Sequence, residues 1–555
     1  MKLNYKKVIF VGFAFFLITA FWQAYDSIVP MMLVNKFGLN QTLSGAIMAL
    51  DNVLALVLLP VFGAISDKTN SKYGKRTPYV VIGTIMAIIA FMGLSFVDNM
   101  QLNKVYSNAN ESQFFEMVWE QGDSIKISNK EYQDGQEKEY TLKDYLSRLT
   151  KNQSYASLSE TEKQEVENSF IALAGDYEKS YIFVDGEYSF ADKEMSGSKN
   201  VYSNIITPCK SAYAWNVTLN NPLPLVLFIT VLLLTLLSMA IFRSPAVALM
   251  PDVTIKPLRS KANAIINLMG TAGGILVLVL GMIFGTGKVY NQTMSYTVFV
   301  LAVCAIMAVG LIIFLLKVRE VKWAKEMEDE TALLTEQGLI KEEEKVEEGN
   351  EKLSKSKTAS LILILASVAL WFMGYNAITT KYSLYASTVL HADYNTTLLI
   401  AQAAAIVSYV PVGIIASKIG RKKSILAGVI MLASAFFAAT FVTSQTPPII
   451  ITIFFALAGI GWATINVNSF PMVVELAKGS NTGKYTGFYY TASMSAQIIT
   501  PVLSGLIMDL SGTMTVLFPY ATIFVIGSFI TMLFVKHGDN KVATKKSIIE
   551  HLDVD

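Results

Sequence analysis

The chain has 555 residues, of which 53% are hydrophobic and only 16% are charged, and its mean hydropathy is +0.44. Soluble globular proteins average about 25% charged residues, so this composition argues against an ordinary soluble enzyme and favours a polytopic membrane protein. The formal net charge of +2 gives no reason to expect a nucleic acid as a partner. With two cysteines and three histidines, the chain offers no disulfide framework and little material for a metal site.

Long apolar runs recur along the whole chain. A helix that crosses the ~30 Å hydrocarbon layer needs roughly 20 mostly apolar residues. Twelve such runs predict an all-α membrane protein with twelve transmembrane helices in two six-helix halves. The predicted helices occupy residues 8–34, 43–66, 78–97, 222–248, 260–285, 295–317, 359–385, 395–417, 424–443, 448–476, 484–509 and 514–535. The corresponding regions are 1–97 and 222–317 for the first half, 98–221 for an insert, 318–358 for a linker, 359–538 for the second half and 539–555 for a tail.

Lysine and arginine are concentrated in alternate short loops. The basic loops follow the second, fourth and eighth predicted helices, at residues 68–76, 256–261 and 418–423. Under the positive-inside rule these loops are cytoplasmic. We therefore expect a multi-pass protein of the cell membrane with both termini, the linker and the tail inside, and with the insert outside.

The insert between the third and fourth helices is predicted to be a small extracellular α+β domain. Alternating and periodic patterns predict strands near 124–132 and 181–190, and helices near 141–149 and 159–174. The second of these helices opens with Ser159-Glu-Thr-Glu162, which has the form of a capping box. The linker at 318–358 is rich in glutamate and lysine, which predicts a solvated, partly helical segment.

The two halves share features in the same order, which indicates a duplicated transporter. Gly63 and the basic loop after it have a counterpart at 413–422, and Gly281 corresponds to Gly505. Polar and aromatic residues gather in helices 1, 2, 4, 5, 7, 8, 10 and 11, whereas the cores of helices 3, 6, 9 and 12 contain no charge. Because polar groups at lipid depth are costly unless they face a bundle interior, we expect the eight helices that contain them to surround a central path and every third helix to be peripheral.

Two segments of the first half resemble a known family. Residues 63–78 read GAISDKTNSKYGKRTP, which resembles the loop signature between helices 2 and 3 of the major facilitator superfamily. Its Ser-Asp, Tyr-Gly and Arg-x-Pro elements are closer to the glycoside–pentoside–hexuronide cation symporters and the sucrose–proton symporters. Residues 247–252 (VALMPD) and 259–263 (RSKAN) are similar to the helix 4–5 region of those sugar carriers. The resemblance covers all twelve helices but not the insert.

This resemblance implies alternating-access transport of a small solute, a glycoside or disaccharide, coupled to a cation gradient. Melibiose-type carriers hold their cation with two carboxylates in helix 2, and Ala55 and Leu59 occupy the matching positions here. A proton mechanism based on a single carboxylate therefore fits this chain better than a sodium site.

Two intramembrane carboxylates are candidates for cation or proton coupling. Asp51 falls near the middle of helix 2, and Asp26 lies in the outer half of helix 1, one turn after Trp22. A carboxylate shielded from water binds a proton more readily, which suits reversible protonation. Structural pairing at Asp51 and solvation at Asp26 are the alternatives. Arg243 in helix 4 is a possible ion-pair partner for either carboxylate, or an arginine that snorkels to the interface.

Aromatic and amide groups are expected to contact a sugar, because a mostly apolar pocket with a few fixed polar groups orients such a ligand. The alternative is that they join helices to one another or lie in the interfacial belt. The candidates for substrate binding are Trp22, Tyr25, Asn267, Trp371, Tyr375, Asn376, Gln402, Trp462, Asn466, Tyr490 and Gln497.

A third set of residues, near the cytoplasmic ends of the helices, is expected to act in gating. Here Gly63 would allow close approach of helices, and the carboxylates would pair with loop cations in one state only. The alternative is that the basic residues only set the topology. The gating candidates are Gly63, Asp67, Lys75, Arg76, Asp252 and Arg259. Lys381, near the outer end of helix 7, is expected to snorkel.

No nucleotide-binding loop, zinc-ligand spacing or hydrolase motif occurs in the sequence. The sequence therefore predicts neither an enzyme nor an ATP-driven pump, and it implies no cofactor, nucleotide or metal ion; the proton, or less favourably sodium, is the coupling ion. The expected partners are a small sugar and the lipid bilayer. Two other functions remain open: a membrane receptor or sensor that uses the insert, and a passive facilitator or exporter of a non-sugar solute.

Overall fold

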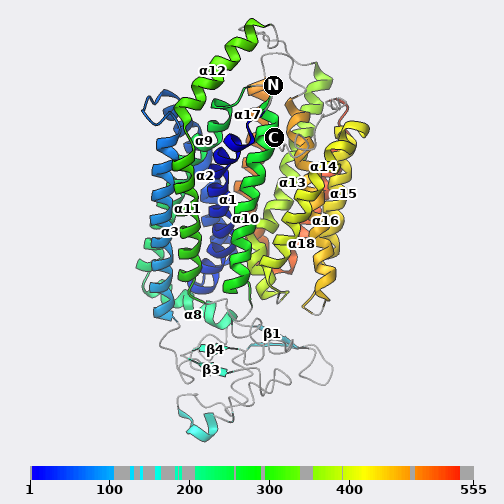
Figure 1. Ribbon diagram of the computed structural model, residues 1–555. Helices are drawn as coiled ribbons and strands as arrows, with labels where there is room; N and C mark the ends of the chain where they lie inside the picture. Colours follow the sequence, from blue (N-terminus) through cyan, green and yellow to red (C-terminus); the bar gives the residue numbers. More distant parts are fainter. Residues whose placement is uncertain are drawn as a thin grey trace.

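The computed structural model describes residues 3–105, 126–129, 138–141, 157–163, 165, 182–184, 187–189, 207–255, 258–288, 294–337, 354–390, 392–444, 446–474 and 482–537. Within these ranges, twelve long apolar helices form the body of the protein (Figure 1). Those of the first half are α1 (Tyr5–Met31), α2 (Gln41–Lys68), α3 (Thr77–Val105), α9 (Leu223–Asp252), α10 (Arg259–Phe284) and α11 (Thr297–Lys317). Those of the second half are α13 (Lys355–Thr388), α14 (Tyr394–Ile419), α15 (Arg421–Ala439), α16 (Pro448–Val474), α17 (Thr482–Ser511) and α18 (Leu517–Leu533).

The twelve predicted helices are confirmed, most of them within a few residues of their predicted ends. By length and composition eleven of the described helices qualify as membrane spans, and α14, with 26 residues, runs beside them. Helices suit this setting because they satisfy every backbone hydrogen bond within the segment. Side chains mark several starts: Asn40 accepts from Leu43 N at the start of α2, and Asp393 accepts from Asn395 N at the start of α14.

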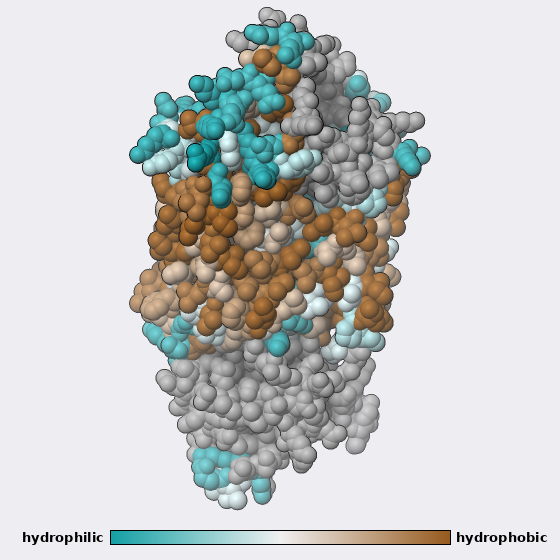
Figure 2. Space-filling view, viewed as in Figure 1, coloured by the Kyte–Doolittle hydropathy of each residue, from teal (hydrophilic) through white to brown (hydrophobic). Residues whose placement is uncertain are grey.

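Each half has its own buried hydrophobic core. In the first half α1 packs on α10 and α3 on α9, and in the second half α16 packs on α14 and α15. Across the halves, α2 packs against α17, α10 against α14, and α1 against α13. Hydrophobic residues form a broad band around the middle of the visible face, as expected for a surface in contact with lipid (Figure 2).

The linker and the insert mark opposite ends of the bundle (Figure 1). The linker contains the charged helix α12 (Glu320–Glu336), which agrees with the helical character predicted there. The insert contributes β1 (Lys126–Asn129) paired with β2 (Lys138–Thr141), β3 (Ile182–Val184) paired with β4 (Glu187–Ser189), and α8 (Thr207–Asn220). We call these the linker end and the insert end.

In the described parts of the insert, β1 lies within the strand predicted at 124–132, whereas the single strand predicted at 181–190 is a hairpin of β3 and β4, and β2 was not predicted. The capping box is present, because Ser159 N donates to Glu162 Oε2 at 2.9 Å and Glu162 N donates to Ser159 Oγ at 3.4 Å. The predicted helix at 141–149 lies outside the described residues except for Thr141, which ends β2, and most of the helix predicted at 159–174 lies outside them too.

The last helix of the insert, α8, is hydrogen-bonded to the insert end of α1, which continues as a short π-helix, η1 (Met32–Lys36). Ser211 Oγ donates to Val34 O at 2.8 Å and Thr218 Oγ1 donates to Phe37 O at 3.0 Å. Beneath α8, Lys36 and Asp98 form a fully buried ion pair with a 2.5 Å N–O distance. Because α3 extends to Val105, Asp98 belongs to this helix rather than to the insert, to which the sequence pattern had assigned it.

Candidate functional site

A cavity of about 350 Å³ lies between the two halves. Its walls come from α1 and α10 of the first half and from α13, α14, α15 and α16 of the second. Of the helices expected to be peripheral, the third, sixth and twelfth contribute no lining residue, whereas the ninth, α15, contributes Phe436. The polar residues that line the cavity are Thr19, Gln23, Asp26, Ser27, Thr271, Tyr375, Thr379, Ser383, Gln402, Tyr409 and Trp462.

One face of α1 supplies most of the polar groups from the first half. Thr19, Gln23, Asp26 and Ser27 follow the i, i+4, i+7, i+8 spacing of a single helix face. Gln23 Nε2 donates to Ser27 Oγ at 3.3 Å, which holds two of these side chains together. Asp26 was predicted to lie on the path and it does.

Trp22 and Tyr25 of α1 pack against other aromatic rings of the first half instead of lining the cavity. Tyr25 is fully buried and stacks on Phe21 with ring centroids 5.9 Å apart. Trp22 packs edge-on against both of these rings, at 5.3 Å from each. Neither residue is among those that line the cavity, so both belong to the packing of the first half in this conformation.

Asp26 also belongs to a cluster of charges inside the first half. Asp26, Asp51 on α2 and Arg243 on α9 are half-buried and interact electrostatically with one another. The Arg243 guanidinium carbon lies 5.7 Å from the centre of the Trp22 ring, within cation–π range. Tyr490 of α17 in the second half interacts with Arg243 as well. Arg243 thus interacts electrostatically with both carboxylates, but among the described residues no direct ion pair joins it to either, so the predicted pairing stays a prediction.

The second half presents a flat aromatic surface and an amide to the cavity. The rings of Tyr375 and Trp462 are parallel within 4° and their centroids are 3.6 Å apart. Gln402 Nε2 donates to Gln23 Oε1 at 2.7 Å, a hydrogen bond that joins the two halves. Gln402 Oε1 is buried and has no hydrogen-bond partner among the described residues. A stacked aromatic pair next to an unsatisfied acceptor can hold a ligand that has an apolar face and hydroxyl donors.

The remaining substrate candidates do not line this cavity. Trp371 is fully buried in the core of the second half. The side-chain amide of Asn376 donates to Phe372 O on its own helix at 2.8 Å. The four others are half-buried or exposed on helices of the same interface: Asn267, Asn466, Tyr490 and Gln497.

Sequence reasoning missed several lining residues, among them Gln23, Thr271, Thr379 and Ser383. A signal for the first was present, because Gln23 shares a helix face with Asp26 and is as polar as the amides that were selected. Trp22 was selected because it lies one turn before Asp26, but its ring packs against its aromatic neighbours rather than lining the cavity.

At the insert end, the halves are joined by hydrogen bonds between α2 and α17. Asp509 near the end of α17 accepts from Gln41 N at 2.9 Å and from Thr42 N at 2.8 Å, so it caps α2 from the other half. Lys381 Nζ donates to Gln41 O at 2.7 Å and to Gln41 Oε1 at 3.2 Å. Lys381 is 1% exposed, so the expectation that it snorkels was wrong; it lies between the halves and contacts Gln41 instead.

A second contact at this end joins α10 and α14. Tyr394 Oη donates to Thr286 Oγ1 at 2.9 Å, and Asn395 Nδ2 donates to the same oxygen at 3.1 Å. The glycines that correspond in the sequence repeat lie at these two contacts. A side chain at Gly281 would collide with Asn395, and one at Gly505 would collide with the backbone of Gln41. The insert end of the path is therefore closed by two helix pairs that the duplication relates to each other.

At the linker end, the predicted gating residues form a network within the first half. Arg76 Nε donates to Asp252 Oδ2 at 2.7 Å, its Nη1 donates to Ser66 Oγ at 2.5 Å, and its Nη2 donates to Asp67. Burial alone would lower the pKa of Arg76, but the hydrogen bonds and charges of Asp252 and Asp67 outweigh burial and raise it above its usual value. Arg76 therefore stays charged.

The linker helix completes this network. The Glu320 carboxylate accepts from the backbone N–H groups of Lys75, Arg76 and Thr77 at 2.5, 2.9 and 2.7 Å. It occupies the start of α3, where backbone donors have no partner within the helix. Gly74 has φ +111° and directly faces this carboxylate, so a side chain there would collide with it.

The three other gating candidates have more local contacts. A side chain at Gly63 would approach Ser244 of α9 to 2.9 Å, which confirms the close approach of helices expected there. Arg259 donates to Thr254 O and Pro251 O at 3.1 and 2.9 Å. Arg259 thus bonds carbonyl groups at the end of α9. The side chain of Lys75, the third of these candidates, is exposed.

Two family models match the chain. The one described as "MFS_1 like family" matches residues 4–399, and the one described as "Major Facilitator Superfamily" matches residues 393–550. The chain belongs to the major facilitator superfamily. This membership, which the sequence motif predicted, makes the protein a membrane transporter and not an enzyme.

Solved structures show the same superfamily fold at low sequence identity. The inward open xylose transporter XylE from E. coli is 12% identical and covers 99% of both chains at a TM-score of 0.56. A D-xylose-proton symporter is 10% identical, and the match covers 96% of this chain and 98% of the symporter with a TM-score of 0.55. A POT family transporter in complex with a conjugated peptide is 9% identical, and the match covers 96% of this chain and 95% of that transporter with a TM-score of 0.52. A search of curated proteins found no match to the sequence.

Proposed function

We propose that this superfamily member moves a sugar, a glycoside or disaccharide, across the cell membrane by alternating access with proton symport. The observation that carries the proposal is the cavity between the halves. There the stacked pair of Tyr375 and Trp462 lines the same space as Gln402, which has an unpaired buried oxygen, and Asp26. The xylose transporters among the structural neighbours also favour a sugar.

In this proposal the aromatic pair packs against the apolar face of the sugar ring. In this structure the Gln402 amide donates one hydrogen bond to Gln23 across the halves. A sugar that inserts between them replaces that hydrogen bond with bonds to its own hydroxyls, and Gln402 Oε1 gains a donor. Because one amide comes from each half, the bound sugar stabilises the conformation in which both halves contact it.

Proton coupling is assigned to Asp26 and Asp51 together. Two carboxylates interact with the single guanidinium of Arg243, so one negative charge in the cluster is in excess. A proton on either carboxylate removes that excess. Asp26 also lines the cavity, so its charge state is felt directly by a bound solute. No further cofactor is proposed.

We propose that the linker end is cytoplasmic and that this conformation faces inward. The insert end is closed by the contacts of α2 with α17 and of α10 with α14. Toward the linker end, Tyr490 interacts with Arg243 of the other half but is 47% exposed. A side chain that faces the opposite half and still contacts solvent favours open space between the halves on that side.

The test is transport by the purified protein in proteoliposomes. A panel of labelled glycosides and disaccharides is measured in counterflow, and a trapped pH dye reports proton movement. We expect counterflow of at least one sugar, and acidification of the interior during uptake. Asp26→Asn should keep counterflow but lose acidification, whereas the matched control Asp329→Asn, exposed on α12, should keep both.

Three results would contradict the proposal, each in a different way. Binding of sugar with no exchange would indicate a sensor. Exchange without acidification in the unmodified protein would indicate a passive facilitator. Counterflow of a non-sugar solute alone would remove the sugar assignment.

A further inference from the structure

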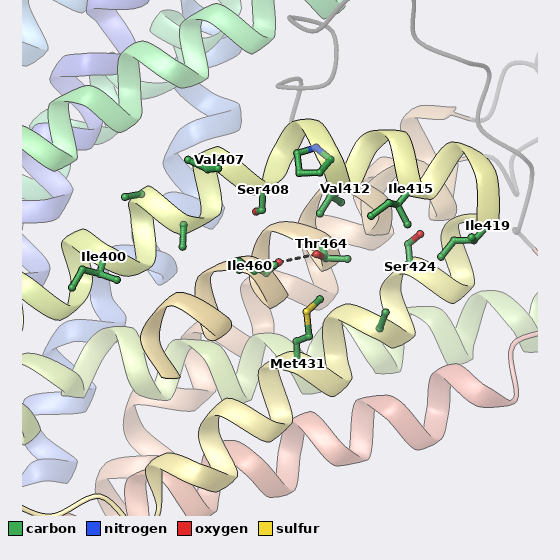
Figure 3. A pocket seen from close by; sticks show the side chains of 14 residues that line it. Ile400, Val407, Ser408, Val412, Ile415, Ile419, Ser424, Met431, Ile460 and Thr464 are labelled. Carbon is green, nitrogen blue, oxygen red and sulfur yellow. Dashed lines mark hydrogen bonds between the residues drawn. The ribbon is translucent and has the colours of Figure 1, made fainter. Parts of the chain in front are cut away.

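A second cavity, of about 730 Å³, lies in the second half and is separate from the central one. It is a groove along α14, with α15 on one side and α16 as its floor (Figure 3). Its lining contains three hydroxyl groups, and each is already bonded to a backbone carbonyl: Ser408 to Ala405, Thr464 to Ile460 and Ser424 to Gly420, at 2.7, 2.7 and 2.9 Å. The groove therefore presents almost only hydrocarbon, and a sugar or another polar solute would find no partner in it.

The groove faces away from the transport path. On α14, Gln402 and Tyr409 line the central cavity, whereas Val407 and Ile415 line the groove. Val407 and Tyr409 are two residues apart, which is about 200° around a helix. Val407 is 75% exposed and Ile415 is 50% exposed. In a membrane protein an apolar surface on this side is in contact with lipid.

The linker end of the groove is bordered by basic residues. α14 and α15 meet at Gly420, and the residues around this turn include Lys418 and Lys423, both with exposed side chains, and Arg421. In addition, α15 begins here, so the positive end of its helix dipole lies among these basic residues, and no side chain of the described residues caps this helix start.

Few negative charges oppose this basic border. The only acidic residues between positions 354 and 537 are Asp393, Glu475 and Asp509. Asp393 and Asp509 lie at the insert end, and Glu475 is outside the described residues. An occupant of the groove therefore has a long apolar part and a negative group at one end.

We propose that this groove binds one anionic phospholipid, with an acyl chain along α14 and the phosphate at Lys418, Arg421 and Lys423. The groove residues of α15 fall within its first eleven residues, about 16 Å from the linker end, which is the depth of one leaflet. The lipid fills the groove between α14 and α15.

The experiment is native mass spectrometry of the purified protein with phosphatidylglycerol and phosphatidylcholine of identical acyl chains. We expect one phosphatidylglycerol to stay bound after activation that removes phosphatidylcholine. Replacing Lys418 and Lys423 by glutamine should lower the preference for phosphatidylglycerol by about fivefold per lysine, the ratio that corresponds to about 1 kcal/mol for each basic residue at an anionic surface. The control is Lys355→Gln with Lys357→Gln, on α13 at the same end, which should keep the preference.

A second pair of variants tests the groove itself. Ala403→Trp fills it and should abolish retention of lipid, whereas Ala305→Trp, at an exposed alanine of α11, should leave retention unchanged. Equal effects of the two tryptophans would overturn the groove assignment. Equal retention of both lipids would overturn the assignment of the phosphate site, and a dimer that excludes lipid would show that a second copy covers this face. If Ala403→Trp does not fold, the lysine variants decide alone.

Discussion

The two ends of the bundle use their polar residues differently. At the insert end, Asp509, Lys381 and Gln41 bond across the halves. At the linker end, Arg76 and its carboxylate partners bond within the first half, and Glu320 adds the linker helix. Bonds across the halves must break when the insert end opens, whereas bonds within one half can persist through a rigid-body movement. The first set acts on the equilibrium between conformations, and the second stabilises one of the moving parts.

The insert end also contains a comparison within itself. The duplication relates the pair of α2 and α17 to the pair of α10 and α14, with Gly505 and Gly281 at corresponding positions. In the first pair, charged side chains bond directly across the halves, whereas in the second the bonds across the halves come from Thr286, Tyr394 and Asn395, and Asp393 bonds Asn395 on its own helix. The bonds across the first contact are the stronger ones, because hydrogen bonds to charged groups are stronger than those between neutral groups.

The largest expected effect is on stability and comes from the linker end. Arg76→Ala removes a 5% exposed guanidinium and leaves Asp67 and Asp252 without it. We expect a loss of about 2 kcal/mol, less than the roughly 3–5 kcal/mol of a fully buried pair, because both carboxylates are partly exposed. Thermal unfolding of the purified protein measures it. Lys75→Ala, at an exposed side chain nearby, should change little, and an equal loss there would contradict the role of the network.

The next effect is on conformation and comes from the insert end. Asp509→Asn weakens the charged cap on α2, and a hydrogen bond to a charged group contributes about 1.5–3 kcal/mol. We therefore expect labelling of Thr379→Cys in the cavity, by an impermeant thiol reagent added on the insert side, to become roughly 10- to 100-fold faster. The background replaces both native cysteines by serine. Unfolding temperature should fall less than in Arg76→Ala.

The related helix pair provides the control for this experiment. Thr286→Val removes two neutral hydrogen bonds between α10 and α14 and should accelerate labelling less than Asp509→Asn does. A larger effect of Thr286→Val would mean that the charged contact is not the stronger of the two.

Much of the fold could be predicted because hydropathy at lipid depth leaves few alternatives to a helix. The sequence repeat also predicted that Gly281 and Gly505 correspond to each other, and both lie where helices of the two halves meet. Within the site, Asp26 and Gln402 were found because polar residues inside predicted spans are costly unless they face a shared interior, and Tyr375 and Trp462 because aromatic rings in the spans suit a sugar.

The partners of Lys381 and Lys36 could not be predicted. Lys381 bonds to the backbone of a residue 340 positions away, and no local sequence pattern links two positions so far apart. Lys36 pairs with Asp98, which the hydropathy of the chain placed beyond the end of its helix. In fact α3 continues because α8 covers it and buries polar residues such as Gln101, which donates to Thr218 at 3.1 Å. Tertiary contacts of this kind override local hydropathy.

A smaller effect is expected where the linker helix meets α3. Glu320→Gln keeps the shape of the side chain but removes the charge that faces three backbone N–H groups, for a loss of about 1 kcal/mol. Because α12 is held to the first half through this residue, limited proteolysis of the linker should become faster while the labelling of Thr379→Cys from the insert side stays unchanged. Faster labelling would show that the linker end also controls the opposite gate. Glu328→Gln, exposed on the same helix, is the control.

The smallest effect separates the two partners of Arg76. Asp67 is 62% exposed and Asp252 is 35% exposed in their side chains, so water screens the first ion pair more than the second. We expect Asp67→Asn to cost less than about 1 kcal/mol and Asp252→Asn to cost more, since exposed pairs contribute little. Thermal unfolding at low and at high salt measures both, and the Asp67 effect should shrink further as salt is added. If Asp67→Asn were instead the more destabilising variant at every salt concentration, Asp67 would have to be buried in another conformation of the protein. Exposure of a carboxylate in one conformation and its burial in another is the behaviour expected of a gate.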